Sequence, residues 1–172
     1  SPSATSPSLT DINDNGFFFR TAPSDKRGGQ ILADITKDRK IKSVAITYEN
    51  SDYGKGLSEM FSLGLKNHGI KITANVSHEN GKADYSSEVA TLASAGGDAV
   101  AVLGYADQGG KGIIQAALDS GAFDTFILGD GMIAKSLVAT FGKDLNKSFG
   151  SMPGSLGKGA SLYQDVAKAG GV

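Results

Sequence analysis

The chain has 172 residues and a net charge of −1, with 40% hydrophobic and 20% charged residues, a composition typical of one globular domain, alone or with a fragment of another. No basic stripe provides the electrostatic footprint of a nucleic-acid-binding protein, and no apolar run approaches the ~20 residues of a membrane-spanning helix. The absence of cysteine excludes a disulfide framework, a thiolate metal site and a cysteine nucleophile.

Apolar runs rich in β-branched residues alternate with amphipathic segments along the chain. Apolar residues at helical spacing, often followed by glycine, predict helices, whereas short apolar or alternating runs predict strands. The expected elements are, in chain order, a helix at 30–36, a strand at 43–48, a helix at 53–68, a strand at 70–76, a helix at 84–95, a strand at 98–103, a helix at 108–120, a strand at 125–129, a helix at 133–141 and a last strand at 148–152.

This alternation predicts an α/β fold class, namely a doubly wound parallel sheet with helices on both faces, in three αβα layers. In such sheets, ligands bind outside the carboxyl ends of the strands. The loops at residues 49–53, 104–108 and 129–132 should therefore matter most for function. The 24 glycines, roughly twice the usual ~7% share, are spread between the apolar runs and indicate tight turns there.

The sequence contains no complete motif of the enzyme classes considered. The segment from Gly104 to Lys111 follows a strand and precedes a helix, as a phosphate-binding loop does. That motif needs G-x4-G-K-[ST], whereas Gly104 lies one residue too far from Lys111, and Gly112 replaces the hydroxyl residue. No G-x-G-x-x-G opens a helix, no G-x-S-x-G elbow occurs, and His68 and His78 are not clustered with other ligands. We therefore expect no enzyme activity, no metal and no cofactor.

Three residues stand in the loops at the expected carboxyl edge of the sheet. Asp130 lies between two glycines, where the backbone can approach a ligand, and Tyr53 and Tyr105 each follow a strand. Taken singly, the aspartate reads equally well as a helix cap and the tyrosines as packing residues. Together, two aromatic rings and a negative charge on one edge favour a small cationic or zwitterionic ligand.

A family resemblance joins these loops to other parts of the chain. The segments SPSATSPSLT, FFFRTAPSD and VAITYENSDYGKGL, the Gly104–Tyr105 turn and the LGDG turn together resemble the leucine/isoleucine/valine-binding proteins in order and spacing. These proteins are periplasmic receptors of ABC importers with the type I periplasmic-binding fold, in which two α/β lobes close around an amino acid at the hinge. The resemblance covers essentially the whole chain and implies a membrane permease as partner, with no nucleic acid and no membrane span.

The resemblance also implies roles for five residues. Ser3 and Thr5 belong to the segment that holds the ligand's α-carboxylate and α-ammonium through its backbone and hydroxyl groups. Tyr53 and Tyr105 match tyrosines of the family's motifs. Asp130 matches the acid that pairs with the α-ammonium. The best-known members carry glutamate at this position, so the side chain here is one methylene shorter, which leaves the specificity open.

The same resemblance divides the chain into three parts. Residues 1–20 are expected to be a remnant of the first lobe and a hinge crossing, with 17–22 extended, residues 21–152 the second lobe, and residues 153–172 the hinge return and the start of a first-lobe tail. The implied function is an extracytoplasmic receptor, periplasmic or lipid-anchored, for a branched-chain-type amino acid or a related small carboxylate. The alternative is a ligand-sensing effector domain of a receptor or transcription regulator, because one fold serves both.

Overall fold

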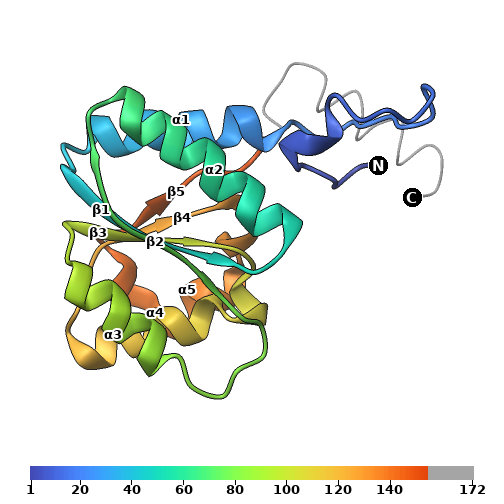
Figure 1. The fold of residues 1–172 in the computed structure, drawn as a ribbon. Helices are drawn as coiled ribbons and strands as arrows, with labels where there is room; N and C mark the ends of the chain where they lie inside the picture. Colours follow the sequence, from blue (N-terminus) through green and yellow to red (C-terminus); the bar gives the residue numbers. More distant parts are fainter. Residues whose placement is uncertain (155–172) are drawn as a thin grey trace.

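The structure, a computed structural model, describes residues 1–154 as a parallel sheet between two layers of helices (Figure 1). The strand order β2-β1-β3-β4-β5 is parallel throughout, and the predicted doubly wound α/β fold is confirmed. The strands are β1 (Ser43–Glu49), β2 (Lys71–His78), β3 (Ala99–Leu103), β4 (Phe126–Leu128) and β5 (Phe149–Gly150), and the helices are α1 (Asp25–Asp38), α2 (Asp52–Asn67), α3 (Ser86–Ala95), α4 (Gly110–Ser120) and α5 (Lys135–Phe141).

Each face of the sheet has its own apolar core. Helices α1 and α2 cover one face, and α3, α4 and α5 cover the other (Figure 1). Side chains alternate between the two faces along a strand, so Val44 and Ile46 of β1 face the first core while Ala45 faces the second. Burial on both faces is why the central strands read as continuous apolar runs in the sequence.

Helix α1 begins five residues before its predicted start. The Ser24 hydroxyl caps the helix by accepting a hydrogen bond from the Lys26 backbone N–H at 3.3 Å. The sequence pattern does not indicate this first turn, because Gly28 and Gly29 lower its helix propensity. In the fold, Gly29 has a packing role: a Cβ there would lie 2.7 Å from the Cβ of Met60 on α2.

The glycine-rich turn before α4 also has a packing explanation. A Cβ on Gly110 would lie 2.2 Å from the sulfur of Met132, and one on Gly112 would lie 2.5 Å from the ring of Tyr85. Gly109 adopts a φ of +145°, a backbone conformation that favours glycine. These glycines therefore allow α4 to lie close to its neighbours. They do not form the phosphate-binding loop that the sequence partly resembles.

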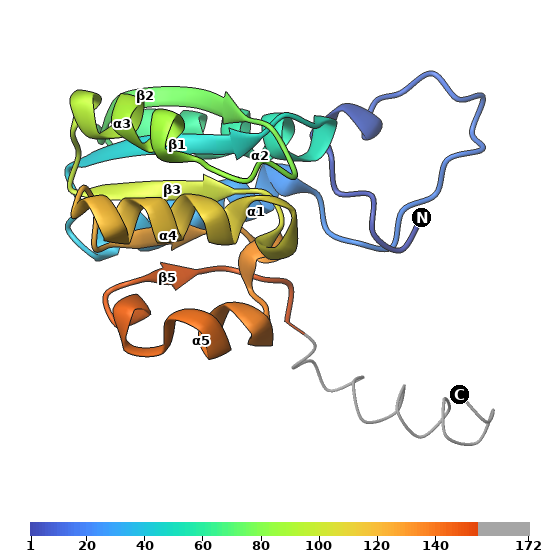
Figure 2. The same ribbon diagram turned by 90° about the horizontal axis from the view of Figure 1, so that it is seen from below.

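The first 24 residues extend away from the sheet as a long excursion (Figure 2). Hydrogen bonds join the beginning and the end of this segment: the Thr21 N–H donates to the Ser1 carbonyl at 3.1 Å, and the Arg20 guanidinium donates to the Ser6 carbonyl at 2.9 Å. Residues 17–21 belong to no helix or strand, and Ala22 lies in a bend. Of the tail predicted at 153–172, residues 155–172 lie outside the described part. No helix within residues 1–154 is long and apolar enough to cross a bilayer.

The two neighbouring glycines of α1 make a matched pair for a stability test. We expect Gly29→Ala to destabilise the chain by about 1–3 kcal/mol, because the new methyl group overlaps α2. We expect Gly28→Ala to stabilise it by up to about 1 kcal/mol, because the nearest atom is 3.9 Å away and alanine favours the helix. Urea unfolding of both variants measures the difference. Equal shifts in midpoint would contradict close packing between α1 and α2.

Candidate functional site

The candidate site lies at the carboxyl edge of the sheet, where three chain segments leave their strands. Tyr53 stands in the first turn of α2, just after β1, and Ser51 caps this helix by accepting a hydrogen bond from the Gly54 N–H at 3.2 Å. Tyr105 follows β3, and Asp130 begins the short 3-10 turn that follows β4. Because parallel strands end at a common edge, residues far apart in sequence meet here.

The structure brings Tyr53, Tyr105 and Asp130 together. The Tyr53 hydroxyl donates to Oδ1 of Asp130 and accepts a hydrogen bond from the Gly131 N–H at 3.2 Å. The rings of Tyr53 and Tyr105 lie 5.0 Å apart between centroids at an interplanar angle of 33°. Gly131 is required here, because a Cβ at this position would lie 2.5 Å from the Gly104 carbonyl oxygen.

The two tyrosines differ in burial and in what they offer to a ligand. Burial, followed by the hydrogen bond to Asp130, raises the pKa of Tyr53 far above its usual range, so this hydroxyl stays protonated and donates. Tyr105 is 43% exposed, and its hydroxyl has no hydrogen-bond partner among residues 1–154. Burial also raises the pKa of Tyr105, and nearby carboxylates add to the rise. Tyr53 therefore orients Asp130, while the ring of Tyr105 is the more accessible to a ligand.

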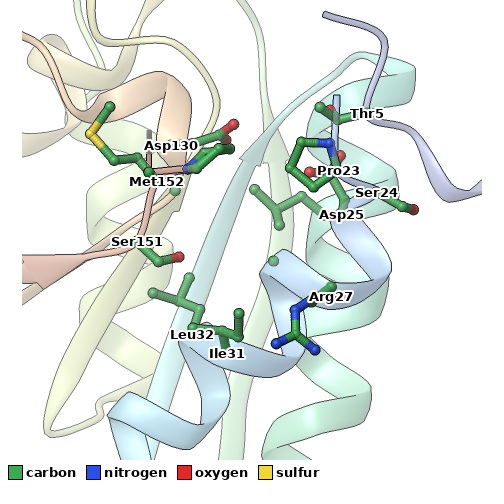
Figure 3. A pocket seen from close by; sticks show the side chains of 15 residues that line it. Thr5, Pro23, Ser24, Asp25, Arg27, Ile31, Leu32, Asp130, Ser151 and Met152 are labelled. Carbon is green, nitrogen blue, oxygen red and sulfur yellow. The ribbon is translucent and has the colours of Figure 1, made fainter. Parts of the chain in front are cut away.

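A cavity of about 260 Å³ opens beside Asp130, between the start of α1, the loop after β4 and residues 151–154 (Figure 3). Asp25, Thr5 and Asp130 line its polar end, and the side chains of Ile31, Leu32 and Leu57 form an apolar wall. A concave site with an apolar wall and a few converging polar groups is typical of small-molecule binding.

The structure separates the two N-terminal residues that the family resemblance singles out. Thr5 lines the cavity, and its carbonyl oxygen accepts a hydrogen bond from the Asp25 N–H at 2.9 Å. Ser3 is exposed and lies outside the lining of the cavity, with its N–H directed to the Ser1 hydroxyl at 3.3 Å. Within this structure, only Thr5 joins the group around Asp130.

Asp25 is the site residue that the sequence reading missed. Its side chain is 4% exposed, and its Oδ2 atom has no hydrogen-bond partner within the described part of the chain. Burial raises the pKa of Asp25 to about 6, the charge of Asp130 adds to the rise, and Thr5 and Arg20 oppose it. The signal for it was the Ser24-Asp25 pair, a capping serine followed by an acid in the first helical turn.

A second polar group lies at the ends of β1 and β2. Glu49 is buried, and its Oε1 accepts a hydrogen bond from Asn80 Nδ2 at 2.9 Å, while its Oε2 has no partner in residues 1–154. His78 is buried beside it, with Nδ1 2.8 Å from the Thr47 hydroxyl, and burial lowers the pKa of this histidine. No group of three or more potential metal ligands occurs among the described residues.

Comparison with known proteins gives the family. The model of the receptor family ligand binding region matches residues 1–155. A Leu/Ile/Val-binding protein homolog 1 of Brucella melitensis is 30% identical over 176 residues, covering 99% of this chain and 46% of the relative. A homolog 3 from the same organism is 33% identical over 129 residues, covering 74% of this chain and 34% of the relative. The chain thus spans less than half the length of these relatives.

Solved structures agree with this assignment. A type 1 periplasmic binding protein of Bordetella pertussis Tohama I superposes with a TM-score of 0.73 at 23% identity, over 88% of this chain and 40% of that one. An ABC transporter substrate-binding protein of Desulfitobacterium hafniense, in complex with Leu, superposes with a TM-score of 0.60 at 25% identity, over 76% of this chain and 39% of that one. The chain therefore belongs to the receptor ligand-binding-region family, in which it is similar to the Leu/Ile/Val-binding proteins, and it has the type I periplasmic-binding fold.

Proposed function

We propose that this chain forms one wall of an extracytoplasmic solute-binding receptor of an ABC importer, and that the receptor binds an amino acid of the branched-chain type or a related small carboxylate. The observation that carries the proposal is the convergence of Tyr53, Tyr105 and Asp130 at one edge of the sheet, beside a cavity that Thr5 also lines. The similarity to Leu/Ile/Val-binding proteins, and to a receptor in complex with Leu, supports an amino-acid ligand.

The chemistry of the site suits an amino acid. A carboxylate that is already oriented by a tyrosine hydroxyl forms a strong charge-assisted hydrogen bond with an α-ammonium group. In the proposed complex Asp130 supplies that carboxylate, Thr5 and Ser3 supply hydroxyl and backbone groups for the ligand's charged end, and the tyrosine rings enclose its side chain. Ser3 takes this role only if the first lobe repositions its segment, because it lies outside the cavity here.

The proposal extends to the organisation of the whole receptor. Residues 1–20 then belong to the first lobe and a hinge crossing, and residues 21–152 form the second lobe. The remainder of the relatives' length supplies the opposite wall of the cleft. The partner is a membrane permease, and the receptor acts in the periplasm or as a lipid-anchored extracytoplasmic protein.

Binding without chemistry is also part of the proposal. The relatives are named as binding proteins. Asp130 accepts a hydrogen bond from the hydroxyl of Tyr53. Burial and this carboxylate raise the pKa of Tyr53 far above its usual range, so the tyrosine is poorly suited to giving up its proton at neutral pH. The site is thus better suited to recognising a charge than to transferring a proton.

The first test compares two isosteric changes at the same edge of the sheet. We expect Asp130→Asn in the full-length receptor to weaken leucine binding by about 10- to 150-fold, the equivalent of about 1.5–3 kcal/mol for a lost charge-assisted contact. Asp107→Asn is the matched control, because Asp107 is exposed and bonded to Lys111 on α4. Calorimetric titration measures both dissociation constants. Equal losses would show that Asp130 has only a local structural role.

A second test concerns the pair that orients Asp130. We expect Tyr53→Phe to destabilise the chain by about 1–3 kcal/mol, because it removes a donor from Asp130 and an acceptor from the Gly131 N–H. Tyr105→Phe removes a hydroxyl without a hydrogen-bond partner among residues 1–154, so its effect should stay within about 0.5 kcal/mol. Denaturant unfolding compares the two variants. A larger loss for Tyr105→Phe would contradict the described hydrogen bonds.

A further inference from the structure

The carboxylate of Asp25 is poorly satisfied in the empty cavity. It is 4% exposed, it lines the cavity, and its Oδ2 atom has no hydrogen-bond partner within residues 1–154. Leaving an ionised carboxylate buried in this way costs free energy. Two events relieve that cost, namely uptake of a proton or arrival of a cationic group.

The charged and titratable groups around Asp25 do not supply the missing cation. Asp130, from the turn after β4, repels it. Arg20, from the crossing segment, directs its guanidinium to the Ser6 carbonyl at 2.9 Å and the Thr10 hydroxyl at 2.8 Å. Arg27, on the same helix, is exposed at the cavity, and none of the ion pairs in the described part of the chain includes Asp25.

The remaining titratable neighbours are neutral. The negative charge of Asp25 is among the causes that raise the pKa values of Tyr53 in α2 and of Tyr105 in the loop after β3. Neither phenol is a cation, and both stay protonated at neutral pH. The cavity therefore has two carboxylates at its polar end and no positive charge between them among the described residues.

We propose that Asp25 takes up a proton in the empty cleft on mild acidification, and that the cationic group of the ligand competes with this proton for the carboxylate. The neutral carboxylic acid gives its proton to water, and the resulting carboxylate accepts a hydrogen bond from the ligand's ammonium group. One proton leaves for each ligand that binds a protonated site. This proposal rests on the proposed function for the identity of its ligand, whereas the protonation of the empty site stands on the structure alone.

Burial, with Asp130 nearby, raises the pKa of Asp25 to about 6 in the empty chain. Ligand binding should lower this pKa, because an ammonium group favours the ionised form. If only the ionised form binds, acidification from pH 7 to pH 5 should reduce the apparent affinity by about tenfold. The contribution of Asp25 to the stability of the empty chain should change in the same window. This contribution is fully present below pH ~4 and is lost as the pH rises through about 6, since the folded chain holds the proton more tightly than the unfolded chain does.

The ligand-free arm of the test follows the aspartate carboxyl carbons of the isotope-labelled chain by NMR between pH 3 and pH 8. One signal should titrate near pH 6 and be absent from Asp25→Asn. Asp119→Asn is the matched control, because Asp119 is exposed on α4 and bonded only to Gln115 among residues 1–154, and its loss should leave the pH 6 signal unchanged. A midpoint for Asp25 below pH 4.5 would overturn the proposal whatever the ligand.

The second arm uses the full-length receptor, because this chain supplies only one wall of the proposed cleft. Leucine is added at pH 5 and pH 7, and the Asp25 signal is followed. We expect the Asp25 midpoint to fall by at least one pH unit and leucine to bind about tenfold more weakly at pH 5. The Asp25→Asn variant should lose this pH dependence, and Asp119→Asn should retain it. Leucine binding with an unmoved Asp25 midpoint would reject the exchange and leave the proposed function standing. If leucine changes nothing at either pH, the proposed function is contradicted. The exchange is then contradicted as well, even if the Asp25 midpoint of the empty site lies near pH 6.

Discussion

The parallel pairing of β1 with β3 is the constraint on which the rest of the molecule depends. The register from Val44 with Ala99 to Tyr48 with Leu103 aligns the carboxyl ends of the two central strands. The chain therefore leaves both strands at one edge, and the residues that follow meet there although they are far apart in sequence. The contact between the rings of Tyr53 and Tyr105 is a direct result of this register.

The apolar cores and the carboxyl edge have opposite characters. Both faces of the sheet are covered by buried aliphatic and aromatic side chains, which stabilise the lobe by removing apolar surface from water. The edge instead holds Asp25 and Glu49, two buried acids that each leave one oxygen without a partner in residues 1–154. Such groups cost about 1–3 kcal/mol each, and they concentrate where a protein meets a ligand. The well-packed cores make this cost tolerable.

Sequence patterns predicted most of the elements because hydrophobic periodicity reflects burial within a single helix or strand. They failed where glycine has a tertiary role. The first turn of α1 was missed because Gly28 and Gly29 suggested a break, whereas Gly29 allows α1 to approach α2. The predicted helix at 84–95 begins only at Ser86, and the last strand has two residues where five were expected. Backbone pairing, rather than residue type, decides such limits.

The sequence by itself determined the α/β order, the family and the three loops that carry Tyr53, Tyr105 and Asp130, because periodicity and motif spacing are local properties. Tertiary structure alone decided that Tyr53 orients Asp130, that Thr5 and not Ser3 lines the cavity, and that Asp25 faces the same space. The cavity is built from segments more than one hundred residues apart. Desolvation and hydrogen-bond pairing, which set the chemistry of a carboxylate, arise only when those segments meet.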